Sequence, residues 1–272
     1  ANATHGHIRD WNVSQVTDMS GAFKDRDTFN EDISGWDMSK VNNASQMFYG
    51  ASSFNQPIGN WNLSSVTMTW SMFQNAKNFN QPIDDWNLNN VKTMANMFKG
   101  ASSFNMPIGS WETKNSNTMV NMFNGATSFD QFLGNWDISS VTDMRFIFDN
   151  TSSFSNWNKG QMQKAFSFNA NWPYEWLSLT DTNFQNIVNL WFSDEANATA
   201  LYGPIGDWNV SQVTDMSEAF KNRATFNEDI SGWDMSKVND ASRMFYGASS
   251  FNQPIGNWDL SSATMTWSMF QD

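Results

Sequence analysis

The stretch from Ile58 to Phe73, IGNWNLSSVTMTWSMF, decides the fold, because its spacing recurs along most of the chain. Its tryptophan, Trp61, belongs to a series with a period of 25 residues. The other members are Trp11, Trp36, Trp86, Trp111, Trp136 and, after an interruption, Trp208, Trp233 and Trp258. A strict period of this length is typical of a solenoid, in which each coil buries its apolar face by stacking on its neighbours.

Apolar residues keep fixed positions around each tryptophan, which is numbered zero in every coil. Most coils carry isoleucine at −3, an apolar residue at +2 and valine at +5, as in Ile58, Leu63 and Val66. This alternation predicts a short strand. Thr or Asn at +6 suits a helix N-cap, and apolar residues at +8, +11, +12 and +15 have the spacing of one helix face. We therefore expect an α/β repeat solenoid, with a short parallel strand and a short capped helix in each coil.

The interruption between Trp136 and Trp208 divides the chain. We predict a first repeat solenoid over 1–154, an irregular closing layer over 155–180, a cap helix with its lead-in over 181–204, and a second solenoid over 205–272 that is a near copy of 8–75. The cap helix is expected from the apolar spacing of 182–191. Residues 10–74 and 207–271 align without gaps and differ at seven of 65 positions. The chain is thus expected to hold two solenoid segments in tandem.

The repeated string has the form Trp-Asp/Asn-Val-Ser-x-Val-Thr-Asp-Met-Ser-x-x-Phe, followed by Phe-Asn-x-x-Ile. Residues 11–33 and 208–230 match this string closely, and it resembles the BspA-like bacterial-surface-protein repeat family, a leucine-rich-repeat-like solenoid. The resemblance implies an extracellular or cell-surface repeat scaffold, with adhesion proposed for some members. It carries over no catalytic residues.

Composition and charge argue against several classes of function. The 27 acidic residues outnumber the 15 basic ones, so the net charge of −12 disfavours nucleic acid and anionic membranes as partners. No apolar run is long enough to insert into a membrane, and the chain has no cysteine. The two histidines, His5 and His7, lack a third ligand for a metal. We expect no enzyme activity and no cofactor.

The two ends of the chain hold complementary parts of one coil. At a head-to-tail junction, Phe270 stands 13 residues before Trp11 of the next copy, the same separation as Phe73 and Trp86. We therefore expect a filament in which 270–272 of one protomer and 1–11 of the next complete a coil. The expected interface consists of Ala1, Thr4, Ile8, Trp11, Trp258, Trp267, Met269 and Phe270. A slice of a longer tandem repeat protein is the other interpretation of these ends.

Side-chain oxygens at +1 offer an alternative function, that of a surface adhesin. With the serines at +3 they form an Asn/Asp/Ser face suited to a glycan, a host protein or Ca²⁺. The face equally fits a solvated surface with stacked amides. The +1 residues are Asn12, Asp37, Asn62, Asn87, Glu112, Asp137, Asn209, Asp234 and Asp259.

Sequons for N-glycosylation occur seven times in the chain. Their modification would imply export, whereas chance also produces them in an Asn- and Ser-rich repeat. The acceptor residues are Asn2, Asn12, Asn43, Asn62, Asn150, Asn197 and Asn209.

Overall fold

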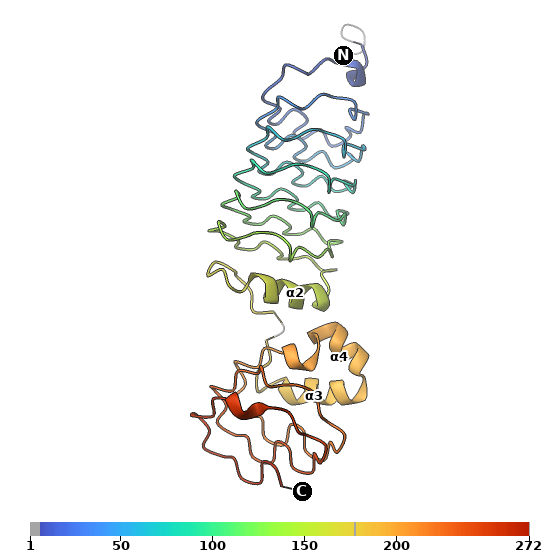
Figure 1. Ribbon diagram of the computed structural model, residues 1–272. Coiled ribbons are helices and arrows are strands. Elements are labelled where there is room, and N and C mark those ends of the chain that lie inside the picture. Colours follow the sequence, from blue (N-terminus) through green and yellow to red (C-terminus); the bar gives the residue numbers. More distant parts are fainter. Residues whose placement is uncertain (1–5, 177, 272) are drawn as a thin grey trace. The chain divides into compact units, whose positions relative to one another are not determined.

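The computed structural model describes residues 6–176 and 178–271. The chain forms two compact units, Ala1–Tyr174 (unit 1) and Glu175–Asp272 (unit 2). Unit 1 stacks the coils that begin at Trp11, Trp36, Trp61, Trp86, Trp111 and Trp136, and unit 2 stacks those that begin at Trp208, Trp233 and Trp258 (Figure 1). The helices are η1 (Ile8–Asp10), α2 (Asn156–Phe166), α3 (Phe184–Ser193), α4 (Glu195–Tyr202), η2 (Ile205–Asp207) and η3 (Ile255–Asn257).

The coils do not contain the predicted strand around the tryptophan. This segment is two successive turns: Trp61 N–H donates to Ile58 O (3.1 Å) and Val66 N–H donates to Leu63 O (2.9 Å). The parallel pairing lies farther along the coil, as isolated bridges between +7 residues, such as Asn43 with Met68. The apolar alternation was misleading because turns, like a strand, can direct the side chains at −3, 0, +2 and +5 inward.

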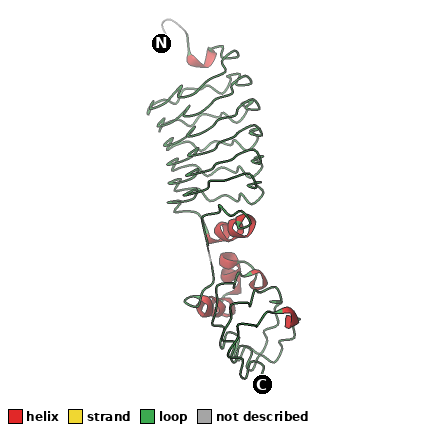
Figure 2. Ribbon diagram, turned by 90° about the vertical axis from the view of Figure 1, so that its left-hand side faces the viewer, coloured by secondary structure: helices red, strands yellow, loops and turns green. Residues whose placement is uncertain are grey.

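The predicted helix at +8 to +15 is also wrong, and Figure 2 draws this part of every coil as loop. Its amides alternate between two kinds of acceptor. Met47 N–H donates to Ala44 O in the same coil (3.2 Å), whereas Phe48 N–H donates to Met72 O of the next coil (2.9 Å). An α-helix uses its amides internally, so these turns gain hydrogen bonds between coils that a helix would forgo.

Left-handed residues at +10 and +14 produce this alternation. Gln46 (φ 56°) and Gly50 (φ 70°) occupy these positions in the Trp36 coil. Every coil has a positive φ at +10, and also at +14 wherever that residue is described. The +14 residue is always Gly, Asn or Asp where described, the residue types that adopt this conformation at least cost. That restriction at +14 was the sequence signal for turns.

Aromatic rings form the core of each unit, stacked from coil to coil. Phe48 and Phe73, both at +12, have ring centroids 5.4 Å apart, and Phe73 lies 4.0 Å from Phe79 at +18 of its own coil. The indoles of Trp61 and Trp86 stack at 6.5 Å. The three phenylalanines are fully buried. Each ring therefore depends on the coils on both sides of it.

Helices accompany the coils in both units. The segment 155–180, predicted to be irregular, contains the 11-residue helix α2, whose N-cap Ser155 accepts a hydrogen bond from Asn158 N–H (3.2 Å). In unit 2 the residues predicted to form one cap helix form two, α3 and α4. Helix α3 buries Phe184, Ile187, Val188 and Trp191. These apolar residues pack into the same core as the coils of unit 2.

Candidate functional site

The two faces of a coil are chemically different, because the hydrogen bonds between coils have a direction. The amides at +8, +10, +12 and +14 donate to carbonyls of the following coil, as Ser71 N–H does to Ala95 O (2.8 Å) and Phe73 N–H to Met97 O (2.9 Å). Between +7 and +14, a coil thus presents N–H groups to the coil after it and C=O groups to the coil before it. We call these the donor face and the acceptor face. At +6 and +17 the backbone bonds run the other way, as from Thr67 N–H to Asn42 O of the preceding coil (2.9 Å).

Two side-chain ladders run in the opposite sense. Trp86 Nε1–H donates to Ile58 O of the preceding coil at 3.1 Å, and the other tryptophans from Trp36 to Trp136 do the same. Asn80 N–H donates to Oδ1 of Asn55 (2.9 Å). This asparagine ladder fixes the register of neighbouring coils, and it was not expected from the sequence although Asn regularly follows the +18 phenylalanine.

The Trp258 coil leaves its donor face open. Among the described residues, no group accepts a hydrogen bond from the backbone N–H of Thr266, Ser268 or Phe270. Phe270 is 58% exposed and Trp267 is 52% exposed, although every other phenylalanine at +12 is buried. Trp258 of the predicted interface is half-buried, and Met269 is buried. The open face is therefore apolar with a row of backbone donors.

Unit 1 shows how an identical face is covered. The heptapeptide 265–271, MTWSMFQ, is the same as 68–74 in the Trp61 coil. There the Trp86 coil covers the face, and Phe73 is fully buried between Phe48 and Phe98. Another coil is thus a cover that this face accepts.

The Trp11 coil presents an acceptor face. In the part of the chain that the structure describes, no N–H donates to the carbonyl of Asp18, Ser20 or Ala22. Trp11 is 37% exposed and Ile8 is half-buried. The other predicted interface residues of this end, Ala1 and Thr4, lie outside the described residues.

Unit 2 shows a different cover on nearly the same acceptor face. In the Trp208 coil, Thr214 Oγ1 donates to the carboxylate of Asp181 (2.7 Å), and Arg223 lies 4.2 Å from the ring centroid of Phe192 at the end of α3. Thr17 and Arg26 are the equivalents of Thr214 and Arg223 in the Trp11 coil. A helical cap is therefore a second cover that fits this face.

The proposed ligand face at +1 is exposed in all nine coils. Most of its oxygens, however, close local turns: Asn62 Oδ1 accepts from Ser64 N–H (3.1 Å) and Ser64 Oγ–H (2.7 Å). Hydrogen bonds from Ser39 hold the pKa of Asp37 below its ordinary value. Among the described residues, no three His, Cys, Asp or Glu side chains are grouped so that they would hold a metal ion.

The sequon asparagines lie on the surface wherever they are described. Asn43 is half-buried and its side-chain amide donates to Asp18 (3.4 Å). Asn2 lies outside the described residues. The exposed ones are Asn12, Asn62, Asn150, Asn197 and Asn209.

The stacked coils with directional ladders define a tandem-repeat protein. The chain belongs to the family described as Mycoplasma protein of unknown function, DUF285, whose model matches residues 1–98, 71–172 and 160–272. This match confirms that the chain is a repeat protein and is consistent with a bacterial surface repeat protein. The narrower BspA-like assignment stays a prediction. No curated protein matches the chain. In the described ranges, no helix has the length and apolar character needed to cross a membrane.

Proposed function

We propose that this protein is a non-enzymatic, extracellular structural protein that assembles head to tail. The donor face of the Trp258 coil of one copy stacks on the acceptor face of the Trp11 coil of the next. The supporting observation is that both faces are open and that their groups match in register. The extracellular location is inferred from the resemblance to surface repeat proteins.

The register follows from the internal coils. Continuing the ladder pairs Thr266 N–H with Asp18 O, Ser268 N–H with Ser20 O, and Phe270 N–H with the carbonyl of Ala22. The Phe270 ring then stacks on Phe23, as it already stacks on Phe245 at 5.4 Å. Each of these named contacts thus has a counterpart between internal coils of unit 1.

The joint is expected to be weaker than an internal contact. Burying a phenylalanine side chain contributes roughly 1.5–3 kcal/mol, and each added hydrogen bond about 0.5–1.5 kcal/mol. The Trp11 coil, however, carries Ala22 at +11, where most coils carry methionine, so less apolar surface is buried. Assembly should therefore depend on protein concentration. Because the two faces differ, the contact does not close on itself and produces a filament.

Sedimentation velocity and negative-stain microscopy of the 272-residue protein at rising concentration test this proposal. The wild type should form fibres, and Phe270→Asp should stay monomeric because it places a charge in the joint. Phe132→Asp is the control, since Phe132 is 44% exposed and lies in the Trp111 coil, away from both faces of the joint. Discrete monomers of wild type at high concentration, or fibres of Phe270→Asp, would contradict the joint.

A second variant separates the two covers of the acceptor face. In a helical cap such as that of unit 2, the arginine at +15 contacts an aromatic ring of the cap. A stacked coil does not need an arginine at this position. Arg26→Ala should therefore leave the fibres intact. Loss of fibres in Arg26→Ala, with the fold retained, would favour a helical partner over coil stacking.

A further inference from the structure

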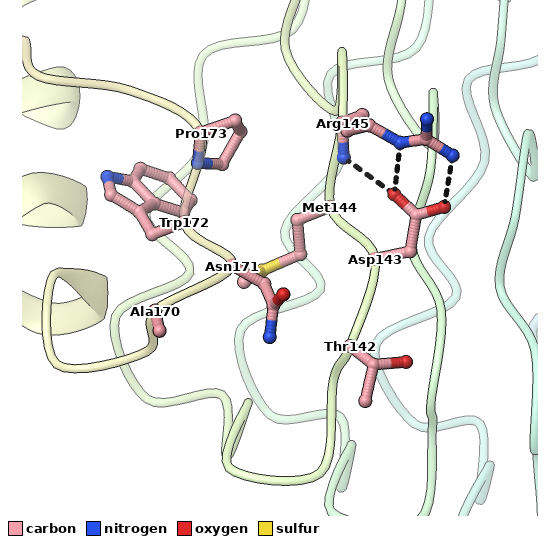
Figure 3. A pocket seen from close by; sticks show the side chains of 8 residues that line it. All are labelled: Thr142, Asp143, Met144, Arg145, Ala170, Asn171, Trp172 and Pro173. Carbon is pink, nitrogen blue, oxygen red and sulfur yellow. Dashed lines mark hydrogen bonds and ion pairs between the residues drawn. The ribbon is translucent and has the colours of Figure 1, made fainter.

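The last coil of unit 1 has a donor face that its closing layer covers only in part. A cavity of about 440 Å³ lies between residues 142–145 of this coil and residues 170–173, which follow α2 (Figure 3). Met144 points from the coil toward Asn171, and Trp172 and Pro173 form the opposite side. The whole cavity belongs to unit 1.

Two backbone donors of this coil, one in the lining of the cavity and one just beyond it, lack the partners that their equivalents have. In the preceding coil, Met119 N–H donates to Asp143 O (2.9 Å) and Asn121 N–H donates to Arg145 O (3.0 Å). The corresponding donors of the last coil are Met144 N–H and Phe146 N–H. Within residues 6–176 and 178–271, no acceptor is paired with either of them.

The closing layer replaces only the next rung of the ladder. Phe148 N–H donates to the hydroxyl of Tyr174 (2.9 Å), which in turn donates to Asp149 (2.7 Å). The side-chain amide of Asn169 donates hydrogen bonds to the carbonyls of Ile138 and Val141. The backbone N–H groups at +8 and +10, those of Met144 and Phe146, thus receive no acceptor from the described part of the closing layer.

The side chains around the cavity indicate the chemistry of the missing partner. Asp143 accepts two hydrogen bonds from the Arg145 guanidinium, at 3.0 and 2.9 Å, so its carboxylate is already engaged. Thr142 Oγ1–H donates to Asn117 O (3.1 Å). The open backbone groups are therefore donors two residues apart, on a backbone with the same turns as the other coils, since Phe146 has a φ of 62°.

We propose that this cavity binds a short peptide segment of another protein, which adopts the turns of a coil and so continues the ladder. Two carbonyls of the segment, two residues apart, accept hydrogen bonds from Met144 N–H and Phe146 N–H. An apolar side chain of the segment lies against Trp172 and Pro173. Main-chain hydrogen bonds to an open backbone edge are a general mode of peptide recognition. It is independent of the head-to-tail joint, because it uses a different coil.

The probe is a fluorescent heptapeptide copying residues 116–122, SNTMVNM, with blocked ends. In unit 1 this segment supplies the acceptors for the preceding coil, where Met94 N–H donates to Thr118 O (3.1 Å) and Asn96 N–H to Val120 O (2.9 Å). Fluorescence anisotropy with the full chain should show saturable binding. Amide exchange measured by NMR should slow at least tenfold at Met144 and Phe146.

Substitution tests the location. Ala170→Trp fills the cavity and should weaken binding at least tenfold, whereas Ala200→Trp, at an exposed position of α4, should leave it unchanged. The NMR readout also separates this cavity from the open face of unit 2, because peptide there protects Thr266 and Ser268 instead. No saturable binding, or binding that leaves the Met144 and Phe146 amides unprotected, would overturn the proposal.

Discussion

Removal of one ring from the middle of the aromatic stack tests how the coils hold each other. Phe98 is fully buried, and its ring centroid lies 5.6 Å from Phe73, 4.0 Å from Phe104 and 5.7 Å from Phe123. Phe98→Ala should cost about 3–5 kcal/mol of the free energy of unfolding of unit 1, as buried phenylalanine truncations do. We expect the upper part of this range, because the inter-coil hydrogen bonds prevent the neighbouring rings from closing the cavity.

The second unit supplies a matched control in the same chain. Phe245 occupies the same +12 position, but its neighbour Phe270 is itself 58% exposed. Phe245→Ala should therefore cost less than Phe98→Ala, near the lower end of the same range. Monomeric protein is used, so that the filament joint does not contribute to stability.

Hydrogen exchange measured by mass spectrometry across a urea series reports the stability of each unit separately. Phe98→Ala should accelerate exchange in the coils next to Phe98 and leave unit 2 unchanged, and Phe245→Ala should do the reverse. A loss below about 1 kcal/mol for Phe98→Ala, or equal effects in both units, would refute the idea that each ring is supported by its two neighbouring coils.

Three further outcomes follow from local geometry. Trp86→Phe removes a buried hydrogen bond and should cost about 1–3 kcal/mol in urea unfolding, whereas Trp70→Phe, at a 39% exposed position, should be nearly neutral. Gly100→Ala, at φ +68°, would place its Cβ against Oδ1 of Asn75 in the preceding coil and should cost about 1–2 kcal/mol by the same measurement, but Gly35→Ala should not. Hydrogen bonds from Ser39 lower the pKa of Asp37 from 3.8. These bonds therefore stabilise the fold above pH 3.8, and the stabilisation is lost as the pH falls through the folded-state pKa. Acid titration of Asp37→Asn should show a smaller loss of stability below pH 3.8 than that of the wild type.

The buried residues were predictable, but the backbone that carries them was not. The positions of Trp61, Phe73 and Val66 in the repeat pointed to the core, and the structure buries all three. The same spacing wrongly suggested a strand and a helix, because side-chain periodicity reports which positions face inward and not how the chain turns between them. Gly, Asn or Asp at +14, as at Gly50, was the evidence for left-handed turns.

The candidate ligand face shows a second kind of limit. Exposed oxygens at Asn62 and Asp37 were correctly placed on the surface, but their hydrogen bonds to Ser64 and Ser39 depend on a turn that the apolar pattern did not reveal. The open amides of Met144 and Phe146 could not be predicted at all. Met144 is a methionine like the paired Met94 and Met119, and although Phe146 is the one apolar residue at +10, its side chain does not indicate whether its amide is paired.

The order of the residues alone determined the 25-residue period, the near duplication and the set of side chains available for a core, since each depends on residue type. Only the tertiary structure decided the direction of the ladders and which coil faces stay open. The physical reason is that every residue except proline carries the same N–H and C=O groups. Their partners are therefore set by the path of the chain through space and not by the side chains they bear.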